Sequence, residues 1–415
     1  MIQIISSRNA KAVDRLLSVS EAGGRSTAKY VAAIVSAVKR RGDRALLQYA
    51  RRFDGLREPL EVSRDEIEEG AARVPPAVRA ALAAAARNIR KVARRQRPGH
   101  WTLTTAPGVS VEQRVTPLDR VGCYVPGGRY PLPSSLLMTA IPARAAGVPQ
   151  VVVACPRPAP IVMAAARIAG VDRLFRMGGA HAIAALAYGT MSVPRVDKIV
   201  GPGNRFVAAA KALVASDCAI DFYAGPTEIV IVSERGNPRW IAADLIAQAE
   251  HDPEARAILM TSSKRLAANV MREVAGQLRS LTGQSPAREA LSRCGGIILA
   301  RDASEAVDLA NRAAPEHLVC DDEKTAGRVR CAGAIFIGSY TAQVAGDYAI
   351  GSNHVLPTNG AARFRGGLNA ADFVRVSTVQ RMTPAGLRAL APTIVTLARQ
   401  EGLEGHARSI EVRRR

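Results

Sequence analysis

The sequence predicts an α/β protein built from two doubly wound, Rossmann-like parallel-sheet domains, with a helical N-terminal region and a helical C-terminal tail. Three observations support this fold class. A chain of 415 residues is longer than one compact core usually holds, short apolar strands alternate with helical segments in two separate series, and only 4% of the residues are aromatic in a composition that is 48% hydrophobic. Strands that alternate with helices indicate parallel sheets covered on both faces.

The N-terminal region, up to about residue 105, is predicted to be helical. In "SRDE", Ser63 and Glu66 have the spacing of a capping box, in which a hydroxyl and a carboxylate satisfy backbone donors reciprocally. The pair Pro75–Pro76 starts another run of helix, because proline fits the first helical turn. From Gly108 the pattern changes to the alternation of "VSVEQRVTPL", and then to a glycine- and proline-rich loop over residues 122–135.

Two series of strands and helices follow this loop. The first series has strands at 150–156, 172–178 and 196–204, and helices at 160–170, 180–190 and 206–216. The second series has strands at 227–234, 256–263, 295–302 and 333–338, and helices at 238–252, 264–278 and 303–314. Each series is typical of one doubly wound module. The tail, from about Ala370, is predicted to be helical.

Composition excludes several classes of protein. The six cysteines are scattered and form no CxxC pair, which indicates reduced thiols and not a disulfide framework or a cysteine-based zinc finger. No apolar run is long enough to span a bilayer, and "MIQIISSRNAK" lacks the pattern of a secretory signal. We therefore expect a cytoplasmic protein with no membrane partner.

The formal net charge of +21 raises the question of a polyanionic partner. The basic residues are spread through helices that are rich in alanine and leucine, and no RNA-binding aromatic signature accompanies them. Most charge runs are solvated faces, so we expect no nucleic-acid partner. An anionic cofactor would also gain from this charge.

The loop "GPGNRF", residues 201–206, follows a predicted strand, where a doubly wound module normally binds its ligand. Its glycines allow a ligand to approach the backbone, and Asn204 can donate and accept hydrogen bonds at a helix start. The dinucleotide fingerprint G-x-G-x-x-G is absent. Considered locally, such a loop is more often a structural turn than a phosphate cradle.

Histidines beside other polar residues are the candidates for chemistry. In "QAEH", Gln248 and His251 are spaced i, i+3, which places both on one helix face, as two ligands of one metal ion require. The pattern is not H-E-x-x-H, and the alternative is a solvated helix end. In "APEHL", Glu316 and His317 follow a helix and a proline, so that on a loop one could handle a water while the other acts as general base. A polar helix C-cap is the alternative there.

Two later motifs add possible partners for these residues. In "GDYAIGSNHVLPT", Asp347 offers the hard oxygen ligand that Gln248 and His251 lack, whereas His354 is interpreted as a buried structural imidazole. In "EGLEGHARSI", Glu401 and His406 stand five residues apart across a short glycine-containing segment.

Taken together, these motifs resemble the histidinol dehydrogenase family along nearly the whole chain. The similarity runs through "YVPGG", "GGAHAIAALAYGT", "VGPGN", "AGPTE", "DLIAQAEHD", "APEHL", "GAIFIG", "GDYAIGSNHVLPT" and "EGLEGHA", in this order. Each motif is weak alone, but nine in order are specific. In that family the usual residues at two of these positions are a serine in "AGPSE" and a glutamine in "GGAQ", where this chain has Thr227 and His181.

The resemblance implies a set of site residues. Zinc, one ion per subunit, is expected on Gln248, His251, Asp347 and His406, with His406 contributed by the partner subunit of a homodimer. Glu316 and His317 are expected to be catalytic. Substrate contacts are expected from Thr227 and the partner's Glu401, together with His317 and the four zinc ligands. NAD contacts are expected from Tyr124, His181 and Asn204, and the substitution at His181 makes that single contact the doubtful one.

The resemblance also implies a reaction and a division into domains. The reaction is the NAD-dependent oxidation of L-histidinol through bound L-histidinal to L-histidine, with zinc orienting the substrate, His317 as general base and Glu316 activating water. The expected domains are an N-terminal segment 1–20, a first α/β domain of 21–119 and 227–368 with the metal and catalytic residues, a second α/β domain 120–226 that contacts NAD, and a tail 369–415 that packs on the partner.

Two alternatives remain open at this point. One is a related zinc- and NAD-dependent alcohol dehydrogenase of the same fold that oxidises another substrate, such as a sulfonated diol. The other, more remote, is a basic nucleic-acid-binding protein, whose affinity for DNA would depend steeply on salt.

Overall fold

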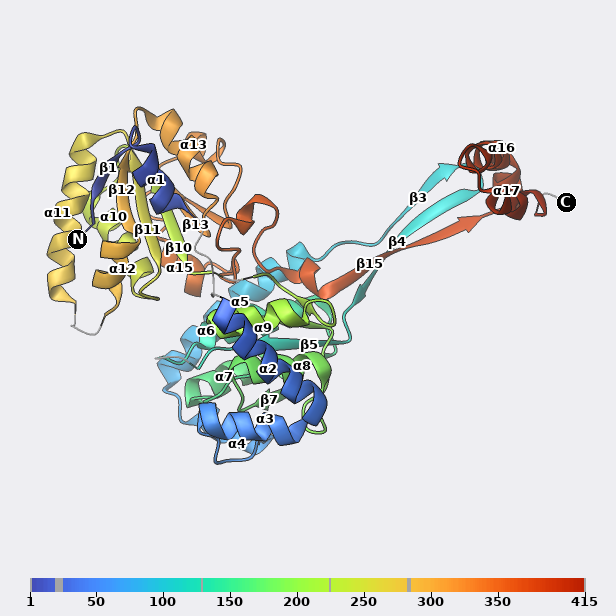
Figure 1. The fold of residues 1–415 in the computed structure, drawn as a ribbon, viewed down its shortest axis with the longest axis horizontal. Coiled ribbons are helices and arrows are strands. Elements are labelled where there is room, and N and C mark those ends of the chain that lie inside the picture. Colours follow the sequence, from blue (N-terminus) through green and yellow to red (C-terminus); the bar gives the residue numbers. More distant parts are fainter. Residues whose placement is uncertain (1, 19–24, 128–129, 224, 282–284, 414–415) are drawn as a thin grey trace.

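A computed structural model describes residues 2–18, 25–127, 130–223, 225–281 and 285–413. Within these ranges the chain forms two lobes, each a six-stranded sheet with helices on its faces, and an arm that projects away from both lobes (Figure 1). The arm is a three-stranded antiparallel sheet that ends in two helices at its tip. The predicted α/β fold with parallel sheets is confirmed.

The first lobe contains a fully parallel sheet with strand order β1-β12-β11-β10-β13-β14. Its strands are β1 (Ile4–Ser6), β10 (Glu228–Val232), β11 (Arg256–Thr261), β12 (Gly295–Leu299), β13 (His317–Cys320) and β14 (Ala334–Ile337). One face is covered by α10 (Pro238–Ala249), α11 (Lys264–Ser280) and α12 (Ala287–Arg293), and the other by α1 (Ala10–Leu17) and α13 (Ala303–Ala313). Two short helices, α14 (Glu323–Ala326) and α15 (Gln343–Tyr348), follow β13 and β14.

The strands of this lobe are apolar on both faces, as expected for a covered parallel sheet. Ile229 and Ile231 of β10 pack with α10 and α11, whereas Val230 and Val232 pack with α1 and α13. This period of two follows from the pleat, which turns successive side chains to opposite faces. The first residue of β10, Glu228, is a buried acidic residue, so the amino end of this strand is polar whereas the rest of it is apolar.

The second lobe has strand order β2-β7-β6-β5-β8-β9, parallel except for β2. Its strands are β2 (Glu61–Val62), β5 (Arg120–Tyr124), β6 (Gln150–Ala154), β7 (Arg173–Phe175), β8 (Lys198–Val200) and β9 (Ala219–Ile220). One face carries α4 (Arg64–Ala72), α5 (Pro76–Gln96), α6 (Pro133–Ala146) and α7 (Pro160–Ala169). The other carries α2 (Arg25–Arg41), α3 (Asp43–Tyr49), α8 (Gly179–Tyr188) and α9 (Arg205–Val214).

The division of residues between the lobes differs from the expected domains. Residues 21–119 were expected in the first domain, but helices α2 to α5 bury their apolar faces on the sheet of the second lobe. Residues 4–6, expected in a separate N-terminal segment, form β1 and pair with β12 in the first lobe. An amphipathic pattern shows that a helix has an apolar face, but it carries no information about which sheet covers that face.

The arm consists of β3 (Trp101–Ala106), β4 (Val109–Pro117) and β15 (Val374–Met382), followed by α16 (Pro384–Gln400) and α17 (Glu404–Glu411). The prediction of a wholly helical tail from Ala370 is therefore wrong for β15. This strand pairs residue by residue with β4, for example Val376 with Val115, so its stabilising partner lies more than 250 positions away in the sequence. Local propensity alone does not report such a pairing.

Two local expectations can also be compared with the structure. The capping box at α4 is confirmed, because Ser63 Oγ accepts from Glu66 N at 3.1 Å and Glu66 Oε2 accepts from Ser63 N at 3.1 Å. "APEHL" was placed on a loop, but His317 begins β13 and its neighbours Leu318–Cys320 are core residues or nearly so.

Among the helices of the described ranges, none is long and apolar enough to cross a membrane.

Candidate active site

The candidate active site lies at the amino ends of β10 and β13 in the first lobe. These strands are neighbours in parallel register, with Ile229 opposite His317, so Thr227, Glu316 and His317 are brought side by side. Gln248 comes from the last turn of α10, and Asp347 from α15, which packs against α10. Four separate segments of the chain therefore supply one cluster.

A chain of hydrogen bonds runs through this cluster. Gln248 Nε2 donates to Thr227 Oγ1 at 2.5 Å, and Thr227 Oγ1 donates to Glu316 Oε2 at 2.5 Å. The same carboxylate oxygen accepts from the backbone N–H of Glu228 at 2.9 Å. A hydroxyl has one proton, so donating it to the carboxylate leaves a lone pair for the amide of Gln248. This arrangement fixes the amide orientation and turns Gln248 Oε1 away from Thr227.

The His317 ring stands between two carboxylates. Its Nδ1 lies 3.2 Å from the carbonyl oxygen of Glu228 and 3.6 Å from Glu316 Oε2, and its Nε2 lies 3.7 Å from Asp347 Oδ1. Because a carbonyl can only accept, the short contact favours a proton on Nδ1 and leaves the lone pair on Nε2. The ring is therefore oriented with its basic nitrogen toward Asp347.

Burial and charge shift the pKa values of these groups in different directions. Burial raises the pKa of Glu316 to about 7, against the opposing effects of the His317 charge and the Thr227 hydrogen bond. Burial lowers the pKa of His317, but the Glu316 and Asp347 carboxylates outweigh it, so the net shift is upward. For Asp347 burial acts to raise the pKa, but the nearby His317 ring outweighs it, so the net shift is downward. Perturbed groups gathered in one place are typical of a catalytic site.

Three buried polar atoms lack a hydrogen-bond partner within the described part of the chain: Gln248 Oε1, His317 Nε2 and Gln343 Oε1. Buried polar atoms are nearly always satisfied, so unsatisfied atoms grouped at one site indicate a ligand. Gln343 is linked to the same site, because its Nε2 donates to Asp347 Oδ2 at 2.7 Å. An amide oxygen, imidazole nitrogens and a carboxylate form a donor set that suits zinc and similar divalent ions.

His251 and His354 lie near this cluster. His354 Nδ1 is 3.0 Å from the carbonyl oxygen of Asp347, and burial lowers the pKa of His354, with the charge of nearby His251 acting in the same direction. Its bond to the backbone agrees with the interpretation of His354 as a structural imidazole. His251 is exposed, two residues beyond the end of α10, and its role as a ligand stays a prediction.

Glu401 and His406 are not brought to this cluster within one chain. Glu401 is the C-cap of α16 and His406 lies in α17, at the tip of the arm, where both are exposed (Figure 1). In keeping with this separation, no group of three or more His, Cys, Asp or Glu side chains in the described ranges is arranged to hold a metal ion. Within the described residues, Glu401 and His406 are therefore separated from the other residues expected at the metal site.

The three residues expected to contact NAD all lie at the carboxyl edge of the sheet of the second lobe. Tyr124 ends β5, and its hydroxyl accepts from Gly179 N, at the start of α8, at 3.0 Å. Burial raises the pKa of Tyr124 to about 12. Asn204 follows β8 and caps α9, because its Oδ1 accepts from Phe206 N at 3.0 Å and Val207 N at 3.2 Å.

His181, the third of these residues, is directed into the lobe. Its Nε2 lies 2.8 Å from Asp54 Oδ2, the side chain is only 2% exposed, and the rings of Tyr49 and Phe53 flank it. Asp54 ends a π-helical segment (Ala50–Asp54) and also accepts from Gly178 N at 2.9 Å. In this structure His181 therefore anchors the start of α8 to the N-terminal region.

Sequence reasoning missed Glu228, Gln343 and Asp54. Glu228 lies inside the motif "AGPTE" and directly follows Thr227, so its position in the sequence could have indicated a place near the site. Gln343 precedes Asp347 by four residues, a spacing that places both on one face once α15 is known to be a helix. Asp54 meets His181 across 127 positions, and the sequence pattern holds no signal for that contact.

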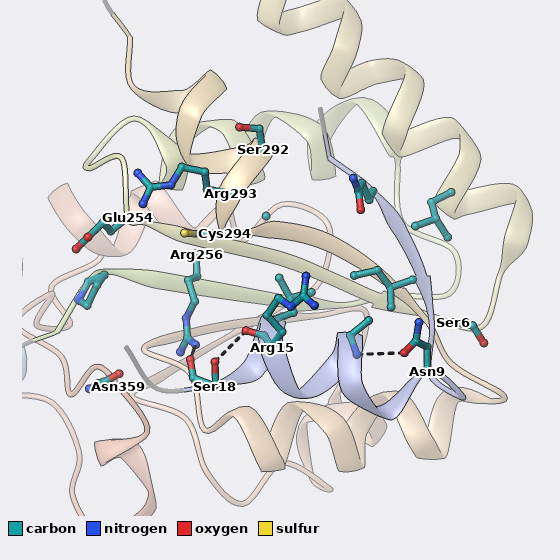
Figure 2. Close-up of a pocket in the computed structure, with 17 residues that line it drawn as sticks. Ser6, Asn9, Arg15, Ser18, Glu254, Arg256, Ser292, Arg293, Cys294 and Asn359 are labelled. Carbon is teal, nitrogen blue, oxygen red and sulfur yellow. Dashed lines mark hydrogen bonds between the residues drawn. The ribbon is translucent and has the colours of Figure 1, made fainter. Parts of the chain in front are cut away.

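A cavity of about 730 Å³ lies beside the cluster, at the amino ends of β1, β12 and β11 (Figure 2). Its polar lining includes Arg15, Arg293 and Arg256, and Arg256 forms an ion pair with Glu228. None of the expected site residues lines it. The cavity therefore adjoins the cluster through one ion pair without being part of it.

The chain is similar to known proteins along nearly its whole length. The family model described as histidinol dehydrogenase matches residues 18–414. Histidinol dehydrogenase of Geobacter sulfurreducens is 46% identical over 410 residues, covering 96% of each chain, and that of Methanothermobacter thermautotrophicus is 47% identical over 396 residues, covering 93% of each. The crystal structure of histidinol dehydrogenase from Elizabethkingia anophelis, 32% identical, superposes with a TM-score of 0.94 and covers 99% of this chain and 98% of that one. The chain belongs to the histidinol dehydrogenase family.

Proposed function

We propose that this protein oxidises L-histidinol in two steps, through bound L-histidinal, to L-histidine, with NAD accepting the hydride of each step. The observation that carries the proposal is the pairing of Glu316 and His317 beside Asp347, with unpartnered atoms of Gln248 and His317 at the same place. One acid–base pair and a polar binding edge meet what an oxidation of an amino alcohol to an amino acid requires.

Gln248, His251 and Asp347, completed by the partner's His406, would hold a zinc ion. The fit rests on the buried, unpartnered Oε1 of Gln248 and on the mixed nitrogen and oxygen donor set. When bound, such an ion would hold the imidazole and amino nitrogens of the substrate and so orient its alcohol carbon. Thr227 supports this role, because its hydroxyl directs Gln248 Oε1 away from the hydrogen-bond chain.

His317 acts as the base in both oxidations. Its Nδ1 faces the Glu228 carbonyl, so the lone pair on the buried, unpartnered Nε2 takes the proton of the substrate alcohol as hydride leaves the carbon. Glu316 then accepts a proton from the water that adds to the aldehyde, while the protonated His317 returns its proton to the carbonyl oxygen and becomes neutral again. His317 removes a hydroxyl proton of the resulting hydrate as the second hydride leaves, which yields the carboxylic acid, and its remaining proton is lost to solvent. Burial keeps the aldehyde from bulk water between the steps.

Tyr124, Asn204 and the start of α8 are proposed to bind NAD. Support comes from their convergence at the carboxyl edge of the second sheet, where doubly wound sheets bind nucleotides. His181 is proposed to contribute indirectly, through its bond to Asp54, because its ring is buried inside the lobe.

We propose that the protein forms a homodimer in which the arm of each subunit reaches the candidate active site of the other subunit. The arm exposes Trp101, Leu103, Val376 and Leu397, each more than 45% accessible, on an element that packs on neither lobe. Exposed apolar area of this kind favours association. A partner arm would bring Glu401 and His406 to a site that lacks them.

The test is the production of NADH from L-histidinol and NAD, with and without a metal chelator. We expect two NADH per histidinol, loss of the rate after chelation, and recovery when zinc is restored. Sulfopropanediol serves as the comparison substrate, and a faster rate with it than with histidinol would contradict the proposed substrate.

A further inference from the structure

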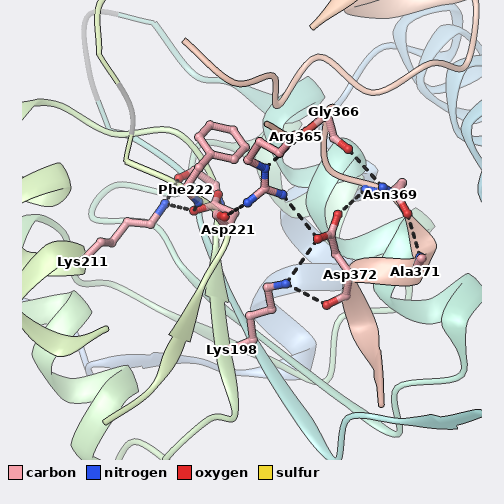
Figure 3. Close-up of polar contacts among 11 residues, drawn as sticks. Lys198, Lys211, Asp221, Phe222, Arg365, Gly366, Asn369, Ala371 and Asp372 are labelled. Carbon is pink, nitrogen blue, oxygen red and sulfur yellow. Dashed lines mark hydrogen bonds and ion pairs between the residues drawn. The ribbon is translucent and has the colours of Figure 1, made fainter. Parts of the chain in front are cut away.

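A buried ion pair in the second lobe lies outside the residues assigned so far. Lys211 of α9 pairs with Asp221, just after β9, and the two side chains are 2% and 0% exposed (Figure 3). Burying two charges costs free energy that a well-packed apolar pair would not cost. Stability alone is thus a weak reason for this pair, and its contacts indicate another.

Both charges act on a single residue, Gly201. Lys211 Nζ contacts the Gly201 carbonyl oxygen at 3.0 Å, and the Gly201 N–H donates to Asp221 Oδ2 at 2.8 Å. The ammonium therefore meets the acceptor of this residue, and the carboxylate meets its donor. Asp221 Oδ1 also accepts from the N–H of Phe222 at 2.7 Å, which fixes the carboxylate plane.

Gly201 occupies a backbone conformation that needs such support. Its φ is +120°, and a Cβ added there would lie 2.2 Å from the carbonyl oxygen of Tyr124. Glycine is free to leave such a conformation, because nothing in its own side chain restrains it. The charged pair supplies that restraint from outside.

Gly201 begins the cofactor loop, residues 201–204, which ends at Asn204. Asn204 uses its Oδ1 to cap α9, so its Nδ2 is the group left to donate to a ligand. The position of that amide depends on the path that the chain takes from Gly201. The loop also packs against Tyr124, the other residue proposed to contact NAD.

We propose that Lys211 and Asp221 are positioning residues for the cofactor loop, and that they set the affinity for NAD by holding the Gly201 peptide. The inference rests on the proposed function, because it takes NAD as the ligand of this loop. Both side chains are buried and contact the Gly201 peptide, so the effect passes through Gly201 to Asn204.

The same network offers a matched control. Arg365 donates to the Asp221 carbonyl oxygen and, at 3.3 Å, to Asp372 Oδ1, and Lys198 Nζ contacts the Asp372 carbonyl oxygen at 2.8 Å (Figure 3). Lys198 is thus a second, mostly buried lysine of this network, but it contacts Asp372 instead of Gly201. Removing its charge tests the network without the loop contact.

The experiment uses the full-length double variant Lys211→Met/Asp221→Asn, which removes both charges together and leaves no unpaired ion. We expect the dissociation constant for NAD to rise at least tenfold, with kcat at saturating NAD and the KM for histidinol within twofold of the parent. The residues proposed to bind histidinol lie in the first lobe, so their contacts are unchanged in the double variant. Lys198→Met should leave the NAD affinity within twofold.

Hydrogen exchange supplies a readout that does not depend on NAD. The Gly201 amide should exchange at least tenfold faster in the double variant, while the amide of Ile199 in β8 exchanges as in the parent. If the double variant does not fold, Lys211→Arg keeps the charge but alters the geometry at Gly201, and the same rise in the NAD dissociation constant is expected.

A folded double variant with the parental NAD affinity and parental exchange at Gly201 would overturn the inference. Failure of the proposed function looks different, because the parent protein itself would then neither bind NAD nor reduce it with histidinol.

Discussion

At the scale of single residues, Thr227 connects Gln248 to Glu316. Its hydroxyl accepts from Gln248 and donates to Glu316, so one side chain fixes both the orientation of the amide and one oxygen of the carboxylate. The family usually has serine here, and either residue offers the same hydroxyl. The additional methyl group of threonine leaves the hydrogen-bond chain intact.

Replacing Thr227 with valine should therefore show how much of its role depends on hydrogen bonding, because valine has nearly the same shape but no hydroxyl group. Thr227→Val leaves Gln248 Nε2 without its acceptor and Glu316 with one donor fewer, and each lost buried partner costs about 1–3 kcal/mol. We expect kcat to fall by about 10- to 100-fold, on the same free-energy scale, whereas Thr227→Ser should stay within about threefold of the parent. Steady-state assays and thermal melts measure both effects, and a valine variant with parental kcat would contradict this role.

Asp244, in α10, predicts a pH dependence of stability. Burial raises its pKa to about 6 from an ordinary value of 3.8. The folded state keeps this proton to higher pH than the unfolded state, so its contribution to stability is present at low pH and is lost as the pH rises through about 4 to 6. Asp244→Asn removes the cost of ionising this carboxyl in the fold.

We expect Asp244→Asn to raise the free energy of unfolding by about 1–2 kcal/mol at pH 7 and to leave it nearly unchanged at pH 4. Urea denaturation of parent and variant at both pH values measures the difference. An equal gain at the two pH values would show that the effect is one of packing and not of protonation.

The sequence was informative about some of these residues and silent about others. Gln248 and Asp347 were found because they stand in short motifs with metal-binding chemistry, and Thr227 because its motif was similar to one in a known family. Gln343 and Asp54 were missed because their roles come from contacts, Gln343 Nε2 with Asp347 and Asp54 with His181, that exist only after folding.

At the scale of elements, the β3–β4 turn and the start of α16 depend on close backbone contact. Gly108 has a φ of +77°, its carbonyl oxygen accepts from Thr383 N at 2.8 Å, and a Cβ on Gly108 would lie 2.2 Å from Thr383 Oγ1. Gly386 packs against the Gly108 carbonyl from the other side. These contacts set how α16 leaves the three-stranded sheet.

Gly108→Ala should loosen the tip of the arm without affecting the lobes. We expect about 1–3 kcal/mol of local destabilisation, from the positive φ together with the steric overlap, and faster hydrogen exchange in α16 with unchanged exchange in β10. Gly402→Ala is the matched control, because Gly402 has a similar φ of +75° but no atom within 4 Å of an added Cβ. Equal effects of the two variants would assign the loss to φ alone.

The strands and helices of the two lobes were largely predictable, and β15 was not. The buried strand at residues 150–154 was predictable from its apolar run, because both of its faces are covered. In β15 most positions are exposed, so no buried face imposes a pattern, and the strand is held by pairing with β4. β13 was missed for a different reason, because it is a short strand that begins with a polar residue, His317.

At the scale of the whole molecule, the two sheets use opposite ends of their strands. The second lobe gathers Tyr124 and Asn204 at the carboxyl ends, as doubly wound sheets usually do, whereas the first lobe gathers Thr227, Glu316 and His317 at the amino ends of β10 and β13. Two sheets were predictable from two series of strands. The sequence did not predict which helices cover which sheet, or which end of the strands carries the candidate site. Both depend on how the lobes pack.

The arm makes the sharpest prediction at this scale. In one chain, His406 is at the tip of the arm and His317 is in the first lobe (Figure 1). If each site is completed by the partner's arm, His406→Ala and His317→Ala homodimers are both inactive, but for different reasons. In a mixed dimer, the site on the His406→Ala subunit keeps its own His317 and receives the partner's His406, so it is complete.

Equal amounts of the two variants, after full exchange of subunits, should therefore recover about a quarter of the parental activity, because half of the dimers are mixed and one site in each of them is intact. If His406 served the site of its own chain, neither site of a mixed dimer would be complete and mixing would restore nothing. Differently tagged subunits, purified as the mixed species, establish that exchange has occurred. An inactive mixed dimer of verified composition would contradict the shared site.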